Sequence, residues 1–281
     1  MVKLISKYLS TFTRDGLGIV LRKLFVKLLL PYKLIRWQYI KNKVSDVNIH
    51  DIKVSVVVPC YQYGVYLEEA INSILSQTVK CKITIIIVND GSTDEHTINV
   101  INKYEKLKAH NIRVVHQPNK GASSARNMGV LHTKAKYICF LDADDKLHPK
   151  FLEKTLRVLE GNLNIDIAYT YACLFGDICA TWTTEDLSLK TIKKYNYIPA
   201  TAVYRTEIWE DLKGYDEAMK SGYEDWDFWI RCAQKGYKGY AIPEKLFYYR
   251  KHSKSMNTDA QKRNIGLKAY INDKIDQRII K

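Results

Sequence analysis

The sequence predicts an α/β fold in which a mostly parallel central sheet is covered by helices on both faces. Three observations support this prediction. Short apolar, β-branched runs alternate with amphipathic segments, four such runs recur between residues 54 and 141, and several of them end in Pro, Asp or Gly. Strands buried on both faces are apolar along their whole length. Ligands bind such sheets at the carboxyl ends of the strands, so we expect one site there.

Each element follows from its local pattern. The β-branched run Val54–Val58 stops at Pro59, which indicates a buried strand. The segment Ser92–Glu95 fits a capping box that opens a helix. The other elements predicted in this half are a helix over 66–76, a strand over 83–88, a helix from the capping box to about Ala109, a strand over 112–116, a helix over 121–132 and a strand over 137–141.

The N-terminal stretch differs in charge from the rest of the chain. The 281 residues carry a net charge of +14, and residues 1–46, with ten Lys or Arg and two Asp, carry +8 of it. Leucines and a valine recur there at helical spacing, which predicts one or two basic amphipathic helices broken at Pro31. Such a segment suits an anionic membrane surface, but it equally suits packing on the body of the protein or a dimer contact. Charges interrupt every candidate apolar core there, so no signal peptide is predicted, and the longest uncharged run of the chain, 54–67, is too short for a transmembrane span.

Composition and cysteine spacing narrow the class of protein. The chain is 46% hydrophobic and 26% charged, which is typical of a globular protein. Its six cysteines form no C-x-x-C pair, so no zinc or redox motif is indicated. Several of them lie in apolar runs, where reduced thiols fit, and this favours a cytoplasmic setting.

An acidic cluster follows the last strand of this half. Asp142, Asp144 and Asp145 come directly after the apolar run 137–141. Alternation along an extended chain would direct Asp142 and Asp144 to the same side. Mg²⁺ and Mn²⁺ prefer oxygen ligands and commonly join carboxylates to substrate phosphates. The cluster therefore predicts a divalent cation site, the alternative being a solvated acidic loop.

Two further segments are placed to meet a nucleotide. Asp90 ends the second strand beside Gly91, where it could accept hydrogen bonds from a base or ribose, or simply form an Asx turn. The segment Gly121–Asn127 opens a helix with small side chains, and Arg126 adds positive charge near its start. Helix N-termini attract phosphates, although small residues also serve tight packing of a helix on a sheet. The chain contains neither a Walker lysine motif nor G-x-G-x-x-G.

Together these segments resemble the nucleotide-sugar-binding half of family 2 glycosyltransferases, which have the GT-A fold. The matching segments are 56–61, 88–94, 121–127 and 140–145, followed by 214–217, 224–229 and 249–252. The resemblance covers about residues 53–255 and implies an inverting transferase that moves a sugar from a nucleoside diphosphate to an acceptor hydroxyl. We expect a helical extension over 1–50, a catalytic domain over 51–255, and a tail over 256–281. The catalytic domain divides into a nucleotide-sugar half, 51–145, and an acceptor half, 146–255.

The resemblance also implies roles for individual residues. Asp225 corresponds to the general base, and Glu224 would orient the acceptor or raise the proton affinity of that base. The alternative is that Glu224, Asp225 and Asp227 only charge the first turn of a helix. Trp182 and Trp226 are weaker candidates for acceptor contacts, and a core role is the alternative. Mn²⁺ or Mg²⁺ would be held by Asp144, Asp142 and His252. The residues expected to bind the nucleotide sugar are Pro59, Tyr61, Asp90, Ala122, Arg126, Asp142 and Ala143.

The basic N-terminus also suggests which acceptor the enzyme uses and where in the cell it works. Relatives with such attachments build bacterial surface polysaccharide, so the acceptor expected by resemblance is a glycan or lipid-linked oligosaccharide at the inner face of the cell membrane. Two other classes stay open: a metal-dependent nucleotidyltransferase, and a basic membrane- or nucleic-acid-binding protein without catalysis. Nucleic acid is disfavoured because three carboxylates at one strand end would repel a polyanion. An oligomer is compatible with the sequence.

Overall fold

The computed structural model describes residues 17–107, 111–161, 164–220, 222–252 and 270, 271 and 274, with side chains from residue 31 onward. The chain divides into two compact units, residues 1–43 and 44–281. The tail predicted over 256–281 and the helix end predicted at Ala109 fall largely outside the described residues.

The described residues of the first unit belong to a long helix, α2 (Leu17–Val44), whose last residue falls in the second unit. The predicted break at Pro31 is wrong, because the helix continues through this residue. Proline removes one backbone hydrogen bond from a helix and usually kinks it, but the residues on both sides favour helix strongly enough to continue. No helix in the described part of the chain is long and apolar enough to cross a bilayer.

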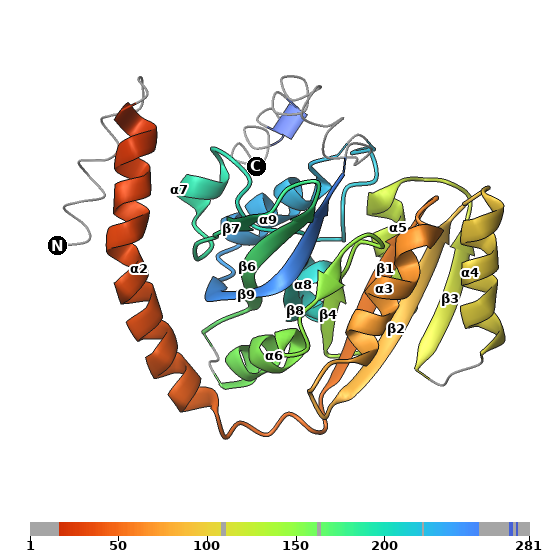
Figure 1. The fold of residues 1–281 in the computed structure, drawn as a ribbon, viewed down its shortest axis with the longest axis horizontal. Helices are drawn as coiled ribbons and strands as arrows, with labels where there is room; N and C mark the ends of the chain where they lie inside the picture. The colour runs from red at the N-terminus through yellow and green to blue at the C-terminus, as the bar shows by residue number, and fades with distance from the viewer. Residues whose placement is uncertain are drawn as a thin grey trace. The chain divides into compact units, whose positions relative to one another are not determined.

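The second unit is built on one mixed sheet (Figure 1). Its strand order is β3-β2-β1-β4-β8-β6-β9-β5, with β7 paired to β6. The strands are β1 (Lys53–Cys60), β2 (Lys82–Asp90), β3 (Ile112–Gln117), β4 (Tyr137–Phe140), β5 (Lys146–Leu147), β6 (Ile167–Gly176), β7 (Ala180–Trp182), β8 (Val203–Arg205) and β9 (Gly239–Lys251).

The predicted α/β fold is confirmed, and pairing differs between its halves. Strands β1 to β4 are joined by parallel pairs, as predicted from their apolar runs. In the other half β6 and β9 are parallel, whereas β8, β7 and β5 pair antiparallel with their neighbours. The central strands are fully buried, which is why they contain β-branched residues at consecutive positions.

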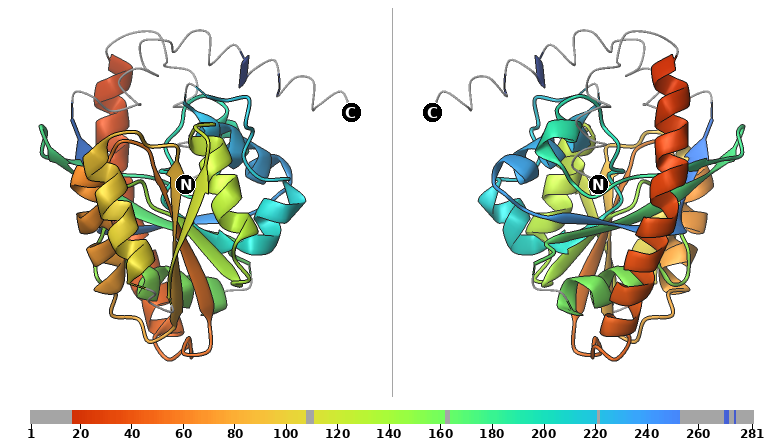
Figure 2. Two further views of the ribbon diagram at one scale, coloured as in Figure 1. Left: turned by 90° about the vertical axis from the view of Figure 1, so that its right-hand side faces the viewer. Right: turned by 90° about the vertical axis from the view of Figure 1, so that its left-hand side faces the viewer.

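Helices cover both faces of the sheet. They are α3 (Gly64–Leu75), α4 (Glu95–Lys106), α5 (Ala122–Leu131), α6 (Phe151–Gly161), α7 (Leu189–Ile192), α8 (Thr206–Asp211) and α9 (Glu224–Gln234). Figure 2 shows α3 and α4 side by side on one face of the first strands, with α5 on the other. The face that carries α5 also carries α8 and α9. Trp226, Trp229 and Ile230 form the buried side of α9.

Two local predictions are corrected by the structure. The N-cap of α4 is Asp94, whose side chain accepts a hydrogen bond from the Thr97 N–H at 2.8 Å. The Ser92 hydroxyl instead accepts from the Gln62 N–H, so the predicted capping box is not formed. Residues 142–145 form a turn, closed by a hydrogen bond from the Asp145 N–H to the Asp142 carbonyl, and are not extended. Strand alternation therefore does not decide where these carboxylates point.

Candidate functional site

A cleft of about 850 Å³ opens at the carboxyl ends of β1, β2 and β4. It also borders the loop before β8 and the start of α9, so both halves of the second unit form its walls. The structure brings together in this cleft almost all residues singled out in the sequence, namely Pro59, Tyr61, Asp90, Ala122, Arg126, Asp142, Ala143, Asp144, Trp182, Glu224, Asp225 and Trp226. His252 does not line the cleft, but it contacts Asp144, which does line it.

Asp90 is held by the loop that precedes α5. One of its carboxylate oxygens accepts hydrogen bonds from the Gln117 side chain at 2.6 Å and from the Lys120 N–H at 2.9 Å, and the other accepts from the Gly121 N–H at 2.9 Å. Gly91 follows with φ of +71°, and a Cβ there would lie 2.6 Å from the Asn119 backbone nitrogen. The carboxylate thus shapes the loop around the cleft, and glycine is needed for the close approach.

Arg126 lies at the centre of a buried ionic group. Its guanidinium is 3% exposed and donates to Asp142 at 2.7 Å and to Glu224 at 2.5 Å. Both carboxylates hold the pKa of Arg126 above its usual value despite burial, which acts in the opposite direction. Arg126 therefore joins α5 to the acidic turn and to the start of α9, and its charge is already balanced within the protein.

Asp144 and Asp145 have different surroundings. Burial, reinforced by Asp142, raises the pKa of Asp144, and the hydrogen bond between its carboxylate and His252 Nε2 at 2.9 Å partly offsets this. Asp145 is fully buried and accepts the Arg250 N–H at 2.8 Å, which ties the turn to β9. Burial and the two neighbouring carboxylates raise the pKa of Asp145 well above its usual value. Burial therefore makes the charged forms of these two carboxyl groups costly.

The predicted metal ligands are only partly gathered. Asp144 meets His252, whereas Asp142 turns toward Arg126. Across the described residues, no group of three or more His, Cys, Asp and Glu side chains is arranged to hold a metal ion. A carboxylate oxygen and an imidazole nitrogen nevertheless suit a divalent cation chemically, and the raised pKa of Asp144 marks a position where a cation would be stabilised.

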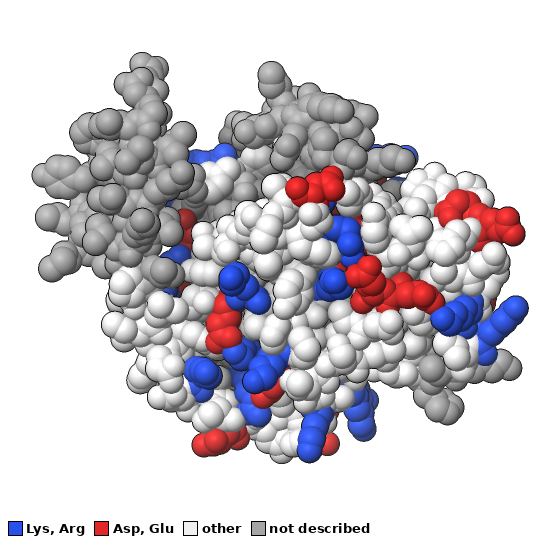
Figure 3. Space-filling model, viewed as in Figure 1, with Lys and Arg blue, Asp and Glu red and all other residues white. Residues whose placement is uncertain are grey.

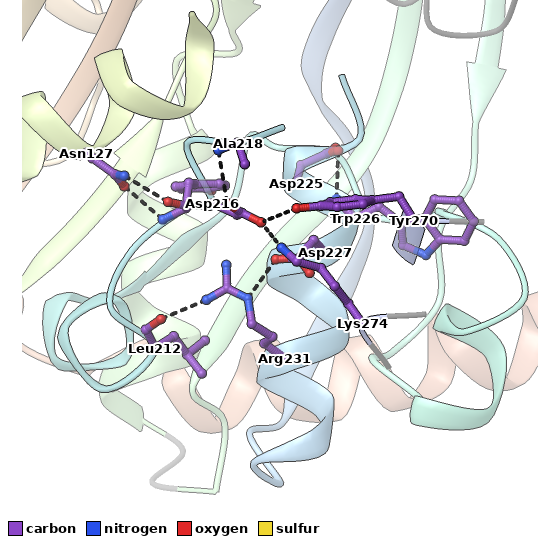
Figure 4. Close-up of polar contacts among 11 residues, drawn as sticks. Asn127, Leu212, Asp216, Ala218, Asp225, Trp226, Asp227, Arg231, Tyr270 and Lys274 are labelled. Atoms are coloured by element: carbon purple, nitrogen blue, oxygen red, sulfur yellow. Dashed lines mark hydrogen bonds and ion pairs between the residues drawn. The ribbon is translucent and has the colours of Figure 1, made fainter. Parts of the chain in front are cut away.

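Asp225 lies half-buried in the first turn of α9 and borders the same cleft as the acidic turn. Figure 4 shows it beside Trp226. Its carboxylate accepts hydrogen bonds from the Trp226 N–H at 2.8 Å and from the Asn196 side chain at 3.0 Å. Burial, followed by the charge of Glu224, raises the pKa of Asp225 to about 7. Arg126 and the two hydrogen bonds act against this rise. The group can therefore take up a proton near neutral pH.

The start of α9 is held by contacts that the sequence did not reveal. Tyr223, its N-cap, has φ of 65°, a conformation that is costly for a side chain of this size. Asp227 binds Arg231 at 2.7 Å, and Arg231 donates to the Leu212 carbonyl at 2.8 Å (Figure 4). These contacts fix the helix so that its first turn, and with it Asp225, faces the cleft.

The two tryptophans predicted to meet the acceptor have different environments. Trp226 is 3% exposed, and its indole N–H donates to the Ile192 carbonyl at 2.5 Å, so most of its surface packs inside the protein. Trp182 lies on β7 with its ring 5.9 Å from that of Tyr249, and both border the cleft. Tyr249 lies in the matching segment 249–252 but was not singled out as a site residue, and Asn196 was missed because it stands in no recognisable motif.

A family model described as glycosyl transferase family 2 matches residues 55–212. An uncharacterized glycosyltransferase of Methanocaldococcus jannaschii is 34% identical over 206 residues, which is 70% of each chain. The chondroitin synthase of Pasteurella multocida is 28% identical over 232 residues, which cover 79% of this chain and 23% of that protein.

Solved structures share the fold. S. aureus TarS in complex with UDP-GlcNAc superposes with a TM-score of 0.60 at 22% identity, over 73% of this chain. The chain spans only 61% of that TarS structure. Mannosyltransferase PcManGT of Pyrobaculum calidifontis, in complex with GDP-Man and Mn²⁺, superposes with a TM-score of 0.57 at 16% identity. The match covers 82% of this chain and 67% of the PcManGT chain. The chain belongs to glycosyltransferase family 2, and its second unit has the GT-A fold.

Proposed function

We propose that this glycosyltransferase moves a sugar from a nucleoside diphosphate to an acceptor hydroxyl with inversion, and that Asp225 is the general base. The observation that carries the proposal is the position of Asp225. Its carboxylate, with a pKa raised to about 7, faces the same cleft as the acidic turn with Asp142 and Asp144. Direct displacement at a sugar carbon requires a base and a donor-binding edge that border the same cleft.

The base acts on the acceptor. As the acceptor oxygen attacks C1 of the donor sugar, its proton passes to Asp225, and the bond from C1 to the diphosphate oxygen breaks with its electrons leaving on the diphosphate. A base with a pKa near the working pH is efficient because it is largely ionised and still holds a proton well. Burial and Glu224 supply that property here.

The donor would occupy the wall at the strand ends. Pro59, Tyr61 and Asp90 close β1 and β2, and Ala122 lies at the N-terminus of α5, which favours phosphate oxygens. Alanine at 122 and 143 leaves room for a close approach of the sugar. TarS binds UDP-GlcNAc and PcManGT binds GDP-Man, so these two donors are the first to test.

A divalent cation fits beside the diphosphate. Asp144, Asp142 and His252 would hold it, and the poorly solvated charge of Asp144 supports this assignment. Such an ion supplies charge stabilisation to the departing diphosphate. Mn²⁺ is present in the PcManGT complex.

A thermal-shift panel tests donor and metal together. UDP, GDP, dTDP and CMP are each added with Mn²⁺ or with EDTA. A ligand that binds only the folded state stabilises it by about 2.7 kcal/mol at a hundred times its Kd. We expect one diphosphate to raise the Tm with Mn²⁺, and this rise to vanish in Asp144→Ala.

The variant Asp225→Asn separates the base from the donor site. Asparagine has the same shape but takes up no proton, so we expect transfer to fall by 10²-fold or more, since general bases contribute about 10²–10⁴-fold. Donor stabilisation should persist in this variant. Transfer at a normal rate by Asp225→Asn would refute the assignment of the base.

We further propose that the acceptor is a glycan on a lipid carrier and that the first unit attaches the enzyme to an anionic membrane. Three apolar residues spaced three and four apart on α2, Tyr32, Ile35 and Tyr39, are 58%, 71% and 68% exposed. This part of the helix also carries Lys33, Arg36, Lys41 and Lys43. Each cation near an anionic leaflet contributes about 1 kcal/mol.

Liposome flotation tests the attachment. The full chain should bind vesicles with 30% phosphatidylglycerol and release them in high salt. Replacing Ile35 and Tyr39 by serine should weaken binding, whereas the same exchange at Leu131, exposed in the second unit, should not. Figure 3 shows basic side chains interspersed with acidic ones on the viewed face. That face therefore presents no continuous basic surface that could bind the vesicles in place of α2. Equal binding by all variants would contradict the proposal.

A further inference from the structure

Asn196 lies in the loop between α7 and β8 and borders the cleft. Its side-chain NH₂ donates to Oδ2 of Asp225 at 3.0 Å. Its Oδ1 accepts the Ile198 N–H at 3.2 Å, within the same loop. Because the amide oxygen is engaged by a backbone donor, the NH₂ group is the end that faces the carboxylate. The contact therefore has a defined direction.

The loop that carries Asn196 is anchored on both sides. Tyr197 is buried, accepts the Ser188 N–H at 2.8 Å and donates to the Asp186 carbonyl at 3.2 Å. Ile198 is fully buried, and the Ile192 carbonyl at the end of α7 accepts the Trp226 indole N–H. The loop is thus fastened to α9 one residue beyond Asp225, which supports the position of the amide beside the base.

The two oxygens of Asp225 are held from different elements. Oδ1 accepts the N–H of Trp226, from the same helix, and Oδ2 accepts the Asn196 amide, from the loop. One contact alone would leave the carboxylate free to turn about its Cβ–Cγ bond. Two contacts determine its plane, and with it the direction of the lone pairs left for a substrate proton.

We infer that Asn196 is a positioning residue for the reaction, which orients the Asp225 carboxylate toward the acceptor hydroxyl and keeps it ionised. This inference rests on the proposed role of Asp225 as the base. Asn196 does not itself touch the reacting atoms. Hydrogen bonds to a carboxylate favour its charged form, and rigid support of a catalytic group limits loss of geometry.

The charges that face Asp225 determine how the variants should behave. Glu224, on the same helix, raises its pKa, and Arg126, from α5, lowers it. Tyr215 and Tyr223 also lie within electrostatic range, and the charge of Asp225 adds to burial in raising the pKa of both phenols. The Asn196 amide adds to the lowering by Arg126. Without the amide, less opposes the rise in the pKa of Asp225 caused by burial and Glu224. Asp225 should therefore bind its proton more tightly.

Two substitutions separate the contact from the loop. Asn196→Asp is nearly isosteric and keeps the oxygen that accepts the Ile198 N–H, but replaces the donor with a second acidic oxygen. Asn196→Ala removes both contacts. Lys194→Gln, on the exposed side of the same loop, is the matched control. Each variant is assayed for transfer between pH 5.5 and 9 with whichever donor stabilises the enzyme.

We expect kcat to fall at least about tenfold at pH 7 in both Asn196 variants, with the donor KM unchanged within twofold. The acid limb of the pH–rate profile should move to higher pH by about one unit in Asn196→Ala, and further in Asn196→Asp because of like-charge repulsion. Lys194→Gln should match the wild type. If instead the acceptor KM rises while the acid limb stays in place, Asn196 binds acceptor and the inference is wrong.

A readout that needs no acceptor completes the test. Protein labelled with ¹³C at aspartate carboxyls is titrated by NMR, and the Asp225 resonance is identified as the one missing in Asp225→Asn. It should titrate near pH 7 in the wild type and at higher pH in both Asn196 variants. An unchanged midpoint refutes the inference about Asn196 even if Asp225→Asn is inactive. An active Asp225→Asn enzyme would instead refute the proposed base.

Discussion

Replacing Arg126 by methionine removes the cation that joins the two halves of the cleft. The guanidinium is 3% exposed and binds Glu224 at 2.5 Å and Asp142 at 2.7 Å. Methionine fills a similar volume, so packing should be largely preserved. What is lost is the balance of charge, because two carboxylates stay behind without their partner.

The two carboxylates contribute unequally to the expected loss. The Glu224 side chain is 9% exposed and cannot be resolvated in place, whereas that of Asp142 is 37% exposed and can. Removing one partner of a buried pair costs about 3–5 kcal/mol, and an exposed pair contributes about 0–1 kcal/mol. We therefore expect Arg126→Met to lower the free energy of unfolding by about 3–5 kcal/mol, most of it from Glu224.

Urea denaturation at pH 8 measures this loss, with Glu224→Gln and the double variant completing a thermodynamic cycle. The double variant should be more stable than Arg126→Met alone, because no buried carboxylate is left unpaired. A change below about 1 kcal/mol at pH 8, or a double variant no better than the single one, would refute this reasoning.

Three further predictions concern stability. A protein that contains an acid with a raised pKa in the folded state loses stability as the pH rises from about 4 to 7. Asp225→Asn should therefore be more stable than the wild type at pH 8 by at least about 1 kcal/mol, and urea titrations should show this gain disappearing at pH 4. Gly129→Ala places a Cβ 2.2 Å from the Val57 Cγ1, so we expect a loss of about 1–3 kcal/mol in thermal unfolding, relieved by Val57→Ala; a stabilised single variant would contradict this. Asp94→Ala removes the cap that accepts the Thr97 N–H and should cost about 1 kcal/mol in urea with donor binding unchanged, whereas a loss of binding would show that this cap also supports the cleft.

The first half of the catalytic unit was predicted closely because local signals there agree. The apolar runs that predicted strands over 83–88 and 112–116 lie within β2 and β3. The errors are also local. Asp94, not Ser92, caps α4, because several polar residues in that turn compete for the same backbone donors, and only packing around Gln62 selects one of them.

The second half was predicted mainly through its resemblance to a family. Its strands β6, β7 and β9 pair partly antiparallel and carry fewer uniform apolar runs, so their order follows from long-range register. The acidic turn illustrates the same limit. Alternation predicted a common direction for Asp142 and Asp144, but the chain turns at this point, and Asp142 meets Arg126 whereas Asp144 meets His252.

The fold class, the available chemical groups and the edge of the sheet where they gather were predictable from residue order, because strands and helices follow from periodicity and ligand types from residue chemistry. How those groups are paired depends on packing between distant elements. Arg126 meets Glu224 from 98 positions away, and Asn196 meets Asp225 from 29. Hydrogen-bond direction and burial depend on a few ångströms across packed elements. Spacing along the chain contains no such information.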